Sequence, residues 1–272
     1  MGTQRLPGRG GSVKRPDWGE RPGGPAKGLP WVAVWTCFRL LFCVLSDLAK
    51  RWVVDLVIPA RDCADTLGPV LEAIPARTVR SVVVVDNGST DLTAQVALDA
   101  GAVVRREPYG GYGAACRRGI AHLEALPTPP DVVVFMAGDG SDDPADIPEL
   151  VAPIRNDNAE LVIGVRDRSP GLRSRVALGL IGALYRHRYE DLGPFRAIQF
   201  PALIALGLSD RGRGLPVEMQ VKAIRYGLRI AEVPVRTTGR ERARQGRVRE
   251  LFGSAGTTGR MLFQILRHAA AR

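Results

Sequence analysis

Short, near-continuous apolar runs recur between Trp52 and Val165, and more mixed segments separate them. The runs with the length of a strand are WVVDLVI (52–58), SVVVVD (81–86), AVVRR (102–106), DVVVFM (131–136) and ELVIGV (160–165). Unbroken apolar runs of this length are typical of parallel strands that are covered on both faces. The alternation of strands and helices predicts an α/β fold with a doubly wound, mainly parallel sheet flanked by helices.

Helices are predicted in the segments between these strands. They cover residues 66–74, a segment that ends at Leu98, residues 113–126 and a segment near 148–154. Ser89 or Thr90 is the expected N-cap of the helix that ends at Leu98, because hydroxyl side chains accept hydrogen bonds from the first helical N–H groups. Gly101 follows that helix, where a helix C-terminus favours glycine.

Five loops follow the carboxyl ends of the predicted strands, where open α/β sheets bind their ligands. Their sequences are PARDCAD, DNGSTD, EPYGGYGAACRRG, AGDGSDDP and RDRSPG. Acids and arginines occur together in these loops, a mixture that suits a divalent metal and a diphosphate. The glycines of the third loop are a weak match to a phosphate-binding loop. Arg117 and Arg118, which follow those glycines, are expected to be solvated helix residues.

The first 50 residues follow other patterns. Residues 1–28 are rich in Gly, Pro and Arg, which predicts a disordered basic arm. Residues 29–48 are strongly apolar but are interrupted by Arg39, and they barely reach the length of about 20 residues that a membrane span needs. Spanning would also place the basic arm outside, against the positive-inside tendency. An interfacial anchor with Trp31 and Trp35 at the headgroups is the preferred interpretation, and a helix packed on the domain is an equal alternative.

Length and composition indicate how many domains the chain can form and what charge its partner carries. The 272 residues accommodate one α/β domain over 51–236, an apolar helix over 29–50, and a basic loop with a helical tail over 237–272. The net charge of +10 indicates an anionic partner. No base-reading motif or aromatic platform supports a nucleic acid. The chain has four cysteines without a CxxC pair and only three histidines, which argues against a zinc site and a disulfide framework. Reduced thiols in the cytosol are the expected state.

Seven segments, in the order and spacing of the family, resemble the family 2 glycosyltransferases of the GT-A fold, and among them the dolichyl- or polyprenyl-phosphate sugar synthases. The segments are LVIPARD, VVVVDNGSTDLT, GGYGAACRRGI, VVVFMAGDGSDDPADIPEL, LVIGVRDR, EDLGPFRAI and VEMQVKAIRYGLRIAEVPV. They extend from about Val54 to Val235, roughly two-thirds of the chain. The resemblance implies a GT-A fold, a GDP- or UDP-linked sugar as donor, and Mg²⁺ or Mn²⁺ as cofactor.

The resemblance also implies a nucleotide-sugar site. It places Asp86 at the base or ribose, to which a carboxylate at a strand end accepts hydrogen bonds. Further residues are expected beside the same ligand: Pro59, Arg61, Gly138, Asp139 and Arg166. An alternative role for Asp86 is the turn that the sequence DNGS forms, and one side chain can serve both roles.

The segment AGDGSDDP matches the metal-binding DxD loop of the resembled family. Asp139 is its second acid and is expected to bind the metal and the nucleotide sugar. Ala137 occupies the position of the first acid, and Ser141 replaces a residue that also ligates metal in the synthases, so the expected metal residues are Asp139 and Ser141. Asp142 and Asp143 are candidates to compensate, and a solvated acidic loop is an equal alternative.

Four further side chains are candidates for catalysis. Arg166 matches an arginine that approaches the donor diphosphate, and Arg196 lies in the segment that closes the acceptor side. Guanidinium groups fit phosphate oxygens, although a surface ion pair is the alternative for each. Glu218 and Asp191 are the candidate bases, and Glu218 can also be a first-turn acid that the helix dipole favours.

These features predict an inverting glycosyltransferase that moves a sugar from a nucleoside-diphosphate sugar to a polyprenyl (dolichyl-type) phosphate. A phosphate is already anionic, so the lack of an obvious acid pair favours it over a hydroxyl, which needs a base. Transfer to a hydroxyl stays open, and so does a degenerate, non-catalytic GT-A domain. The degenerate domain is favoured by Ala137 and by the arginine run of 236–249, which replaces a Gly-x-Ser-Lys turn of the synthases.

The expected location is the cytoplasm, with the protein peripheral at the inner face of the membrane. The segment MLFQIL in the tail, which arginines flank, is suited to lie on a membrane surface. The expected partners are therefore a nucleotide sugar, a lipid phosphate and the membrane surface.

Overall fold

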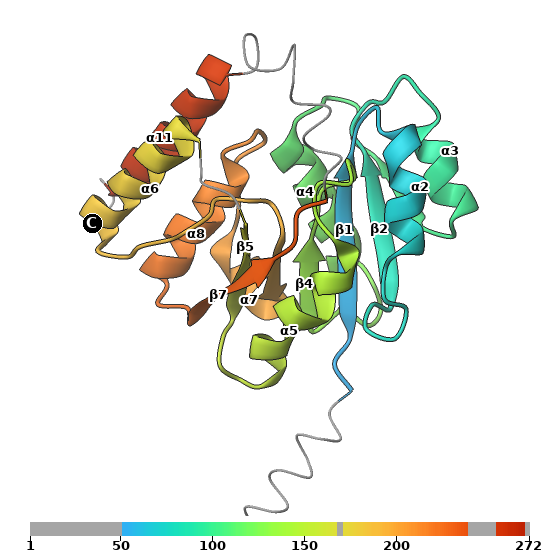
Figure 1. Cartoon of the computed structure of the whole chain (residues 1–272), viewed down its shortest axis with the longest axis horizontal. Coiled ribbons are helices and arrows are strands. Elements are labelled where there is room, and N and C mark those ends of the chain that lie inside the picture. The colour runs from blue at the N-terminus through green and yellow to red at the C-terminus, as the bar shows by residue number, and fades with distance from the viewer. Residues whose placement is uncertain (1–50, 168–170, 239–253, 270–272) are drawn as a thin grey trace, which may run out of the picture. The chain divides into compact units, whose positions relative to one another are not determined.

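Seven strands form one sheet in the computed structural model, which describes residues 51–167, 171–238 and 254–269 (Figure 1). The strands are β1 (Val54–Ala60), β2 (Ser81–Asp86), β3 (Val103–Arg106), β4 (Val132–Phe135), β5 (Leu161–Arg166), β6 (Arg196–Gln199) and β7 (Ile230–Val235). Their order is β3-β2-β1-β4-β6-β5-β7. Only β6 runs antiparallel to its two neighbours. The predicted mainly parallel, doubly wound sheet is confirmed.

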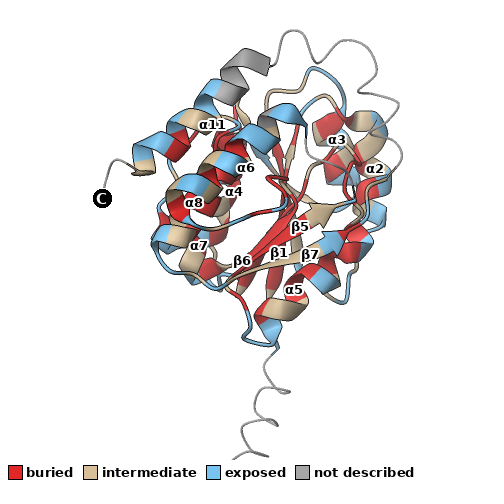
Figure 2. Ribbon diagram, turned by 60° about the vertical axis from the view of Figure 1, so that its left-hand side comes forward, coloured by how far each residue is buried: buried red, intermediate tan, exposed pale blue. Residues whose placement is uncertain are grey.

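Helices cover both faces of this sheet. They are α2 (Ala64–Glu72), α3 (Thr93–Asp99), α4 (Tyr112–Glu124), the short 3-10 helix η1 (Pro144–Asp146), α5 (Ile147–Arg155), α6 (Leu172–Tyr185), α7 (Phe200–Leu206), α8 (Leu215–Arg225) and α11 (Ser254–Ala269). Successive strand residues point to opposite faces. Val57 therefore packs in the core under α4, α6, α7, α8 and α11, whereas Leu56 and Ile58 pack in the core under α2, α3 and α5 (Figure 2).

The start of α3 differs from the prediction. Neither Ser89 nor Thr90 caps the helix, because both face the loop after β1. Ser89 Oγ accepts a hydrogen bond from the Asp62 backbone at 3.1 Å, and the Thr90 N–H donates to Asp62 Oδ1 at 2.8 Å. Asp91 accepts from the Thr93 N–H at 2.9 Å instead. At the other end Gly101 has a φ of +77° and donates to the Leu98 carbonyl, as predicted.

The helix α11 packs against α6 and α8 and contributes Ile265 to the core (Figure 1). None of the described helices is long and apolar enough to cross a membrane. The predicted arm, the apolar segment 29–48 and most of the arginine run 236–249 lie outside the described residues.

Candidate active site

The sheet brings the predicted site residues to one edge. The parallel strands end there, so Asp86 at the end of β2 lies in register with Ala60 of β1 and Arg106 of β3. Because β6 is antiparallel, its first residue, Arg196, reaches the same edge, in register with Phe135 of β4. This antiparallel strand is why an arginine from the start of a strand joins residues from the ends of the others.

The part of this edge where the sequence predicts the nucleoside is built around Asp86. This side chain is buried, and its Oδ1 accepts a hydrogen bond from the Ser89 N–H at 2.9 Å, so the turn that DNGS predicts is formed. Pro59 lies beside it on β1, in register with Val85. Arg61 follows β1 and remains exposed, with its Nε 3.6 Å from Asp62 Oδ2. The three predicted nucleotide residues therefore come together, and Arg61 keeps the freedom to reach a ligand.

The predicted metal loop lies across the end of β1. A Cβ on Gly138 would be 3.1 Å from Ile58 Cγ2 and 3.4 Å from Cys63 Sγ, so only glycine fits without displacement. Asp139 follows and accepts a hydrogen bond from the Ser141 N–H at 3.1 Å. The described residues contain no cluster of three metal-binding side chains. One carboxylate with a nearby hydroxyl still fits a Mg²⁺ or Mn²⁺ ion that shares diphosphate oxygens and water.

The neighbouring acids are engaged within the protein. Arg236, directly after β7, donates to both carboxylate oxygens of Asp146, at 2.6 Å from its N–H and 2.8 Å from its Nε. It also lies 3.3 Å from Asp143, whose Oδ1 caps η1 through the Ala145 N–H. Asp142 is buried and accepts from the Ala137 N–H at 3.4 Å. These acids hold the loop in place through contacts within the protein.

Arg166 and Asp191 form a bidentate pair at the same edge. Arg166 Nε and Nη2 lie 2.8 and 2.9 Å from the two carboxylate oxygens, and both side chains are mostly buried. Burial alone would raise the pKa of Asp191, but the hydrogen bonds and charge of Arg166 outweigh it and lower that pKa. Asp191 is therefore an ionised carboxylate whose oxygens are occupied by Arg166.

Arg196 is a buried cation beside this pair. It is 1% exposed, and its Nη1 donates to the Pro216 carbonyl at 2.9 Å, while its Nη2 contacts the Gly193 carbonyl. Its Nε has no hydrogen-bond partner. The nearby carboxylate, Asp191, favours the charged form of Arg196 through space but is hydrogen-bonded to Arg166. Burial lowers the pKa of this guanidinium. A buried positive charge without a carboxylate of its own favours an anion nearby.

Glu218, a candidate base, is saturated with donors. It is fully buried in the first turn of α8 and accepts from the Ser209 N–H at 3.0 Å, the Ser209 hydroxyl at 2.8 Å and the Asp210 N–H at 2.7 Å. Lys222 Nζ lies 2.9 Å away. Burial opposes the charged form, but Lys222 and these donors outweigh it and lower the pKa of Glu218. This environment suits a residue that fixes the loop 209–214 rather than a base.

That loop also occupies the start of α4. The N–H groups of Gly113 and Ala114 donate to the carbonyls of Gly212 and Arg211, at 3.0 and 2.9 Å. A Cβ on Gly113 would lie 2.3 Å from the Asp210 carbonyl oxygen. The glycines that resemble a phosphate-binding loop therefore allow two backbone segments to approach closely, and loop carbonyls accept the N–H groups of Gly113 and Ala114.

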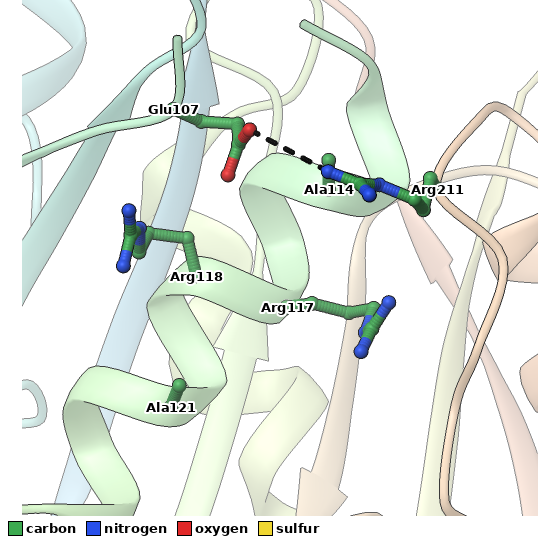
Figure 3. Close-up of a pocket in the computed structure, with 6 residues that line it drawn as sticks. All are labelled: Glu107, Ala114, Arg117, Arg118, Ala121 and Arg211. Carbon is green, nitrogen blue, oxygen red and sulfur yellow. Dashed lines mark ion pairs between the residues drawn. The ribbon is translucent and has the colours of Figure 1, made fainter. Parts of the chain in front are cut away.

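A surface hollow of about 260 Å³ lies on the outer side of α4 (Figure 3). It is lined by Glu107, Ala114, Arg117, Arg118, Ala121 and Arg211. Arg211 Nη2 lies 4.0 Å from Glu107 Oε1. None of the predicted site residues lines this hollow.

The fold and the edge define a glycosyltransferase of the GT-A type. The chain belongs to glycosyl transferase family 2, whose model matches residues 55–203. An uncharacterised glycosyltransferase of Mycobacterium tuberculosis is 38% identical over 190 residues, which cover 67% of this chain and 84% of that protein. The undecaprenyl-phosphate mannosyltransferase of Micrococcus luteus is 33% identical over 197 residues, 65% of this chain and 78% of that protein.

Solved structures agree with the fold. Glucosyl-3-phosphoglycerate synthase from Mycobacterium tuberculosis superposes with a TM-score of 0.68 at 24% identity, over 83% of this chain and 82% of that one. The same enzyme has been solved with Mn²⁺, UDP-glucose and phosphoglyceric acid, again with a TM-score of 0.68. The family and the fold implied by the sequence are thus confirmed.

Sequence patterns missed two features of this edge. The anchoring of the acidic loop by Arg236 and Asp146 joins residues that are 90 positions apart. The saturation of Glu218 depends on Ser209, whose sequence context gives no sign of it. The first feature arises where β7 meets a distant loop, and the second where the loop before α8 folds back onto the helix, so neither has a signal in a short sequence motif.

Proposed function

We propose that this chain transfers a sugar from a nucleoside-diphosphate sugar to a polyprenyl phosphate, with inversion at the anomeric carbon. The observation that carries the proposal is the buried Arg196, which has no carboxylate partner among the described residues and lies at the ligand-binding edge beside Arg166. Asp191 is the nearby carboxylate and is already paired with Arg166, so one acid faces two arginines, and an anionic acceptor would complement the second.

The state of the two candidate bases supports a phosphate acceptor. Asp191 is occupied by Arg166, and Glu218 by the Ser209–Asp210 backbone and Lys222. A hydroxyl acceptor needs a carboxylate that is free to take its proton. A phosphate acceptor needs only positioning and positive charge, which arginines provide. The undecaprenyl-phosphate mannosyltransferase of Micrococcus luteus is a relative whose name contains such an acceptor.

In this mechanism Asp86 accepts hydrogen bonds from the nucleoside, with Pro59 and Arg61 beside it. Asp139 and Ser141 would hold the Mg²⁺ or Mn²⁺ ion, and Gly138 lets the loop approach β1 closely. Such an ion, when bound, stabilises the negative charge that develops on the departing diphosphate. Arg166 screens the diphosphate, and Arg196 positions the acceptor phosphate so that its oxygen lies in line with the bond that breaks.

The donor and the location belong to the same proposal. The mycobacterial synthase has been solved with UDP-glucose and Mn²⁺. A UDP-linked sugar with manganese is therefore the first combination to test. GDP-linked sugars remain the alternative donor. A polyprenyl phosphate resides in a membrane, so the enzyme would work as a peripheral protein at the cytoplasmic face.

A hydroxyl acceptor is the second candidate, and the Arg166–Asp191 pair favours it specifically. If a bound diphosphate draws Arg166 away, Asp191 is released at the acceptor side as a base. Phosphoglyceric acid, bound in the mycobacterial synthase, is a small acceptor candidate that carries both a phosphate and a hydroxyl.

The experiment that tests the proposal offers radiolabelled UDP- and GDP-sugars with Mn²⁺ or Mg²⁺ to the full chain, together with undecaprenyl phosphate or phosphoglyceric acid. A labelled lipid that forms with the wild type and not with Asp139→Asn supports the proposal. Label only on phosphoglyceric acid favours the hydroxyl acceptor. No transfer and no nucleotide binding would indicate a degenerate domain.

A further inference from the structure

Two neighbouring helices expose large apolar side chains. On α6, Leu172 is 77% and Val176 52% exposed, and on α11, Phe263 is 59% and Leu266 53% exposed. The two helices pack against each other, and their opposite faces contribute to the core (Figure 2). We call the exposed positions of these two neighbouring helices the α6–α11 face. Exposed apolar side chains gathered on one surface mark an interaction site.

The charge of this face is of one sign. The sequences of α6 and α11, LRSRVALGLIGALY and SAGTTGRMLFQILRHA, contain arginines but no aspartate or glutamate. Arg175 and Arg267 are exposed beside the apolar positions. Apolar side chains next to basic ones are the pattern of helices that lie in the interface of an anionic membrane.

A second copy of the chain fits this face less well. In a twofold dimer the same surface meets itself, so the arginines of one copy would face those of the other. No acidic side chain of either helix is present to pair with them. Lipid phosphates, in contrast, complement the arginines while the acyl boundary accepts the apolar side chains.

We infer that the α6–α11 face docks on the surface of an anionic membrane, with Leu172, Val176, Phe263 and Leu266 at the boundary between headgroups and acyl chains. The inference rests on the proposed function, because a polyprenyl-phosphate acceptor is presented at such a surface. The face is close to the site along the chain, since α6 begins at Leu172, six residues after Arg166 at the end of β5. Docking here would keep the acceptor side of the sheet edge close to the lipid.

The test is a vesicle titration of the full chain with a matched control. The variant Leu172→Gln/Leu266→Gln removes two apolar side chains from the face. The control Leu92→Gln/Leu98→Gln makes the same change at positions that are 70% and 54% exposed on another part of the surface. Any anchor outside the described residues is common to both variants, so their difference reports on the face alone.

On vesicles of phosphatidylcholine with phosphatidylglycerol, the partition constant of the first variant should fall about tenfold or more, and that of the control by less than about twofold. The variant Arg175→Gln/Arg267→Gln should lose affinity for these vesicles but not for pure phosphatidylcholine. Equal partition of the two leucine variants would overturn the inference. So would a wild-type dimer that Leu172→Gln/Leu266→Gln dissociates without any change in partition.

A parallel assay separates this inference from the proposed function. Transfer to a short-chain, water-soluble polyprenyl phosphate does not require docking, so the first leucine variant should retain it. If the wild type fails to use this acceptor, the proposed function fails whatever the vesicles show. If transfer is present but the two leucine variants partition equally, only the docking face is wrong.

Discussion

Arg166 and Asp191 hold each other through two hydrogen bonds of 2.8 and 2.9 Å at the edge of the sheet. The sequence suggests a separate role for each, an arginine for the diphosphate and an acid for the acceptor proton. The pair changes that expectation, because each side chain now positions the other. Whether Asp191 acts as a positioning residue or as a base is therefore decided by kinetics.

The first prediction concerns Asp191→Asn. As a positioning residue, its loss should lower kcat/KM by about tenfold, because the amide still accepts one hydrogen bond from Arg166. The pH–rate profile should keep its shape. A general base would instead contribute about a hundredfold or more, and its removal would abolish the acidic limb of the profile. That second result would favour the hydroxyl acceptor.

The second prediction is the acid dependence of stability. The pKa of Asp191 in the folded protein lies below its ordinary value of 3.8, so the pair stabilises the fold when the carboxylate is ionised. This contribution is complete above pH 3.8 and is lost as the pH falls through the lower folded pKa. Urea unfolding of the wild type and Asp191→Asn should therefore give curves that differ at neutral pH and converge in acid. A constant difference at all pH values would contradict the ionic pairing.

The third prediction concerns Gly193, which packs against the guanidinium group of Arg166. A Cβ on Gly193 would lie 2.8 Å from Arg166 Nη2, so Gly193→Ala should displace the guanidinium and reduce transfer. Gly179, on the surface of α6, has no atom within 4 Å of such a Cβ, and Gly179→Ala is the control. Turnover should fall about tenfold or more in the first variant only, since a small misplacement of a positioning group is costly. Equal rates in both variants would mean that the place of Arg166 does not matter.

The fourth prediction separates a structural role of Glu218 from a chemical one. Glu218→Gln leaves Lys222 without its buried partner and weakens the hold on Ser209 and Asp210, so it should destabilise the fold by about 2–4 kcal/mol. Glu149, an exposed acid in the first turn of α5, is the control, and Glu149→Gln should change stability by less than about 0.5 kcal/mol. Thermal or urea unfolding measures both. A stable Glu218→Gln protein without turnover would point to a direct role in the chemistry.

The strands were predictable because each has a local signal. Five apolar runs locate β1 to β5, and the acidic loops after them mark the ligand edge before any contact is known. The order of the strands places Asp86, at the end of β2, and Asp139, in the loop after β4, at the same edge on either side of β1, as the general rule for parallel sheets predicts. The fold class and the region of the site therefore follow from short-range patterns and one rule of topology.

The partners within the site were not predictable from such patterns. Asp191 meets Arg166 because β6 enters the sheet antiparallel between β4 and β5, and no residue near Asp191 announces that strand order. Glu218 is occupied because the chain before α8 folds back over it. Ser89 and Thr90 have the sequence position of helix caps, yet both form hydrogen bonds with Asp62 of another loop instead. Non-local hydrogen bonds overrode local propensity in each case.

The most direct measurement of the central claim compares two acceptors that differ by a single phosphate. The full chain is given a nucleotide sugar and Mn²⁺ with either undecaprenyl phosphate or undecaprenol, and Asp139→Asn serves as the inactive control. The account predicts a sugar–phosphate–lipid product from the first acceptor, none from the second, and loss of product in the variant. Transfer to the alcohol alone, or undiminished transfer by Asp139→Asn, would contradict it.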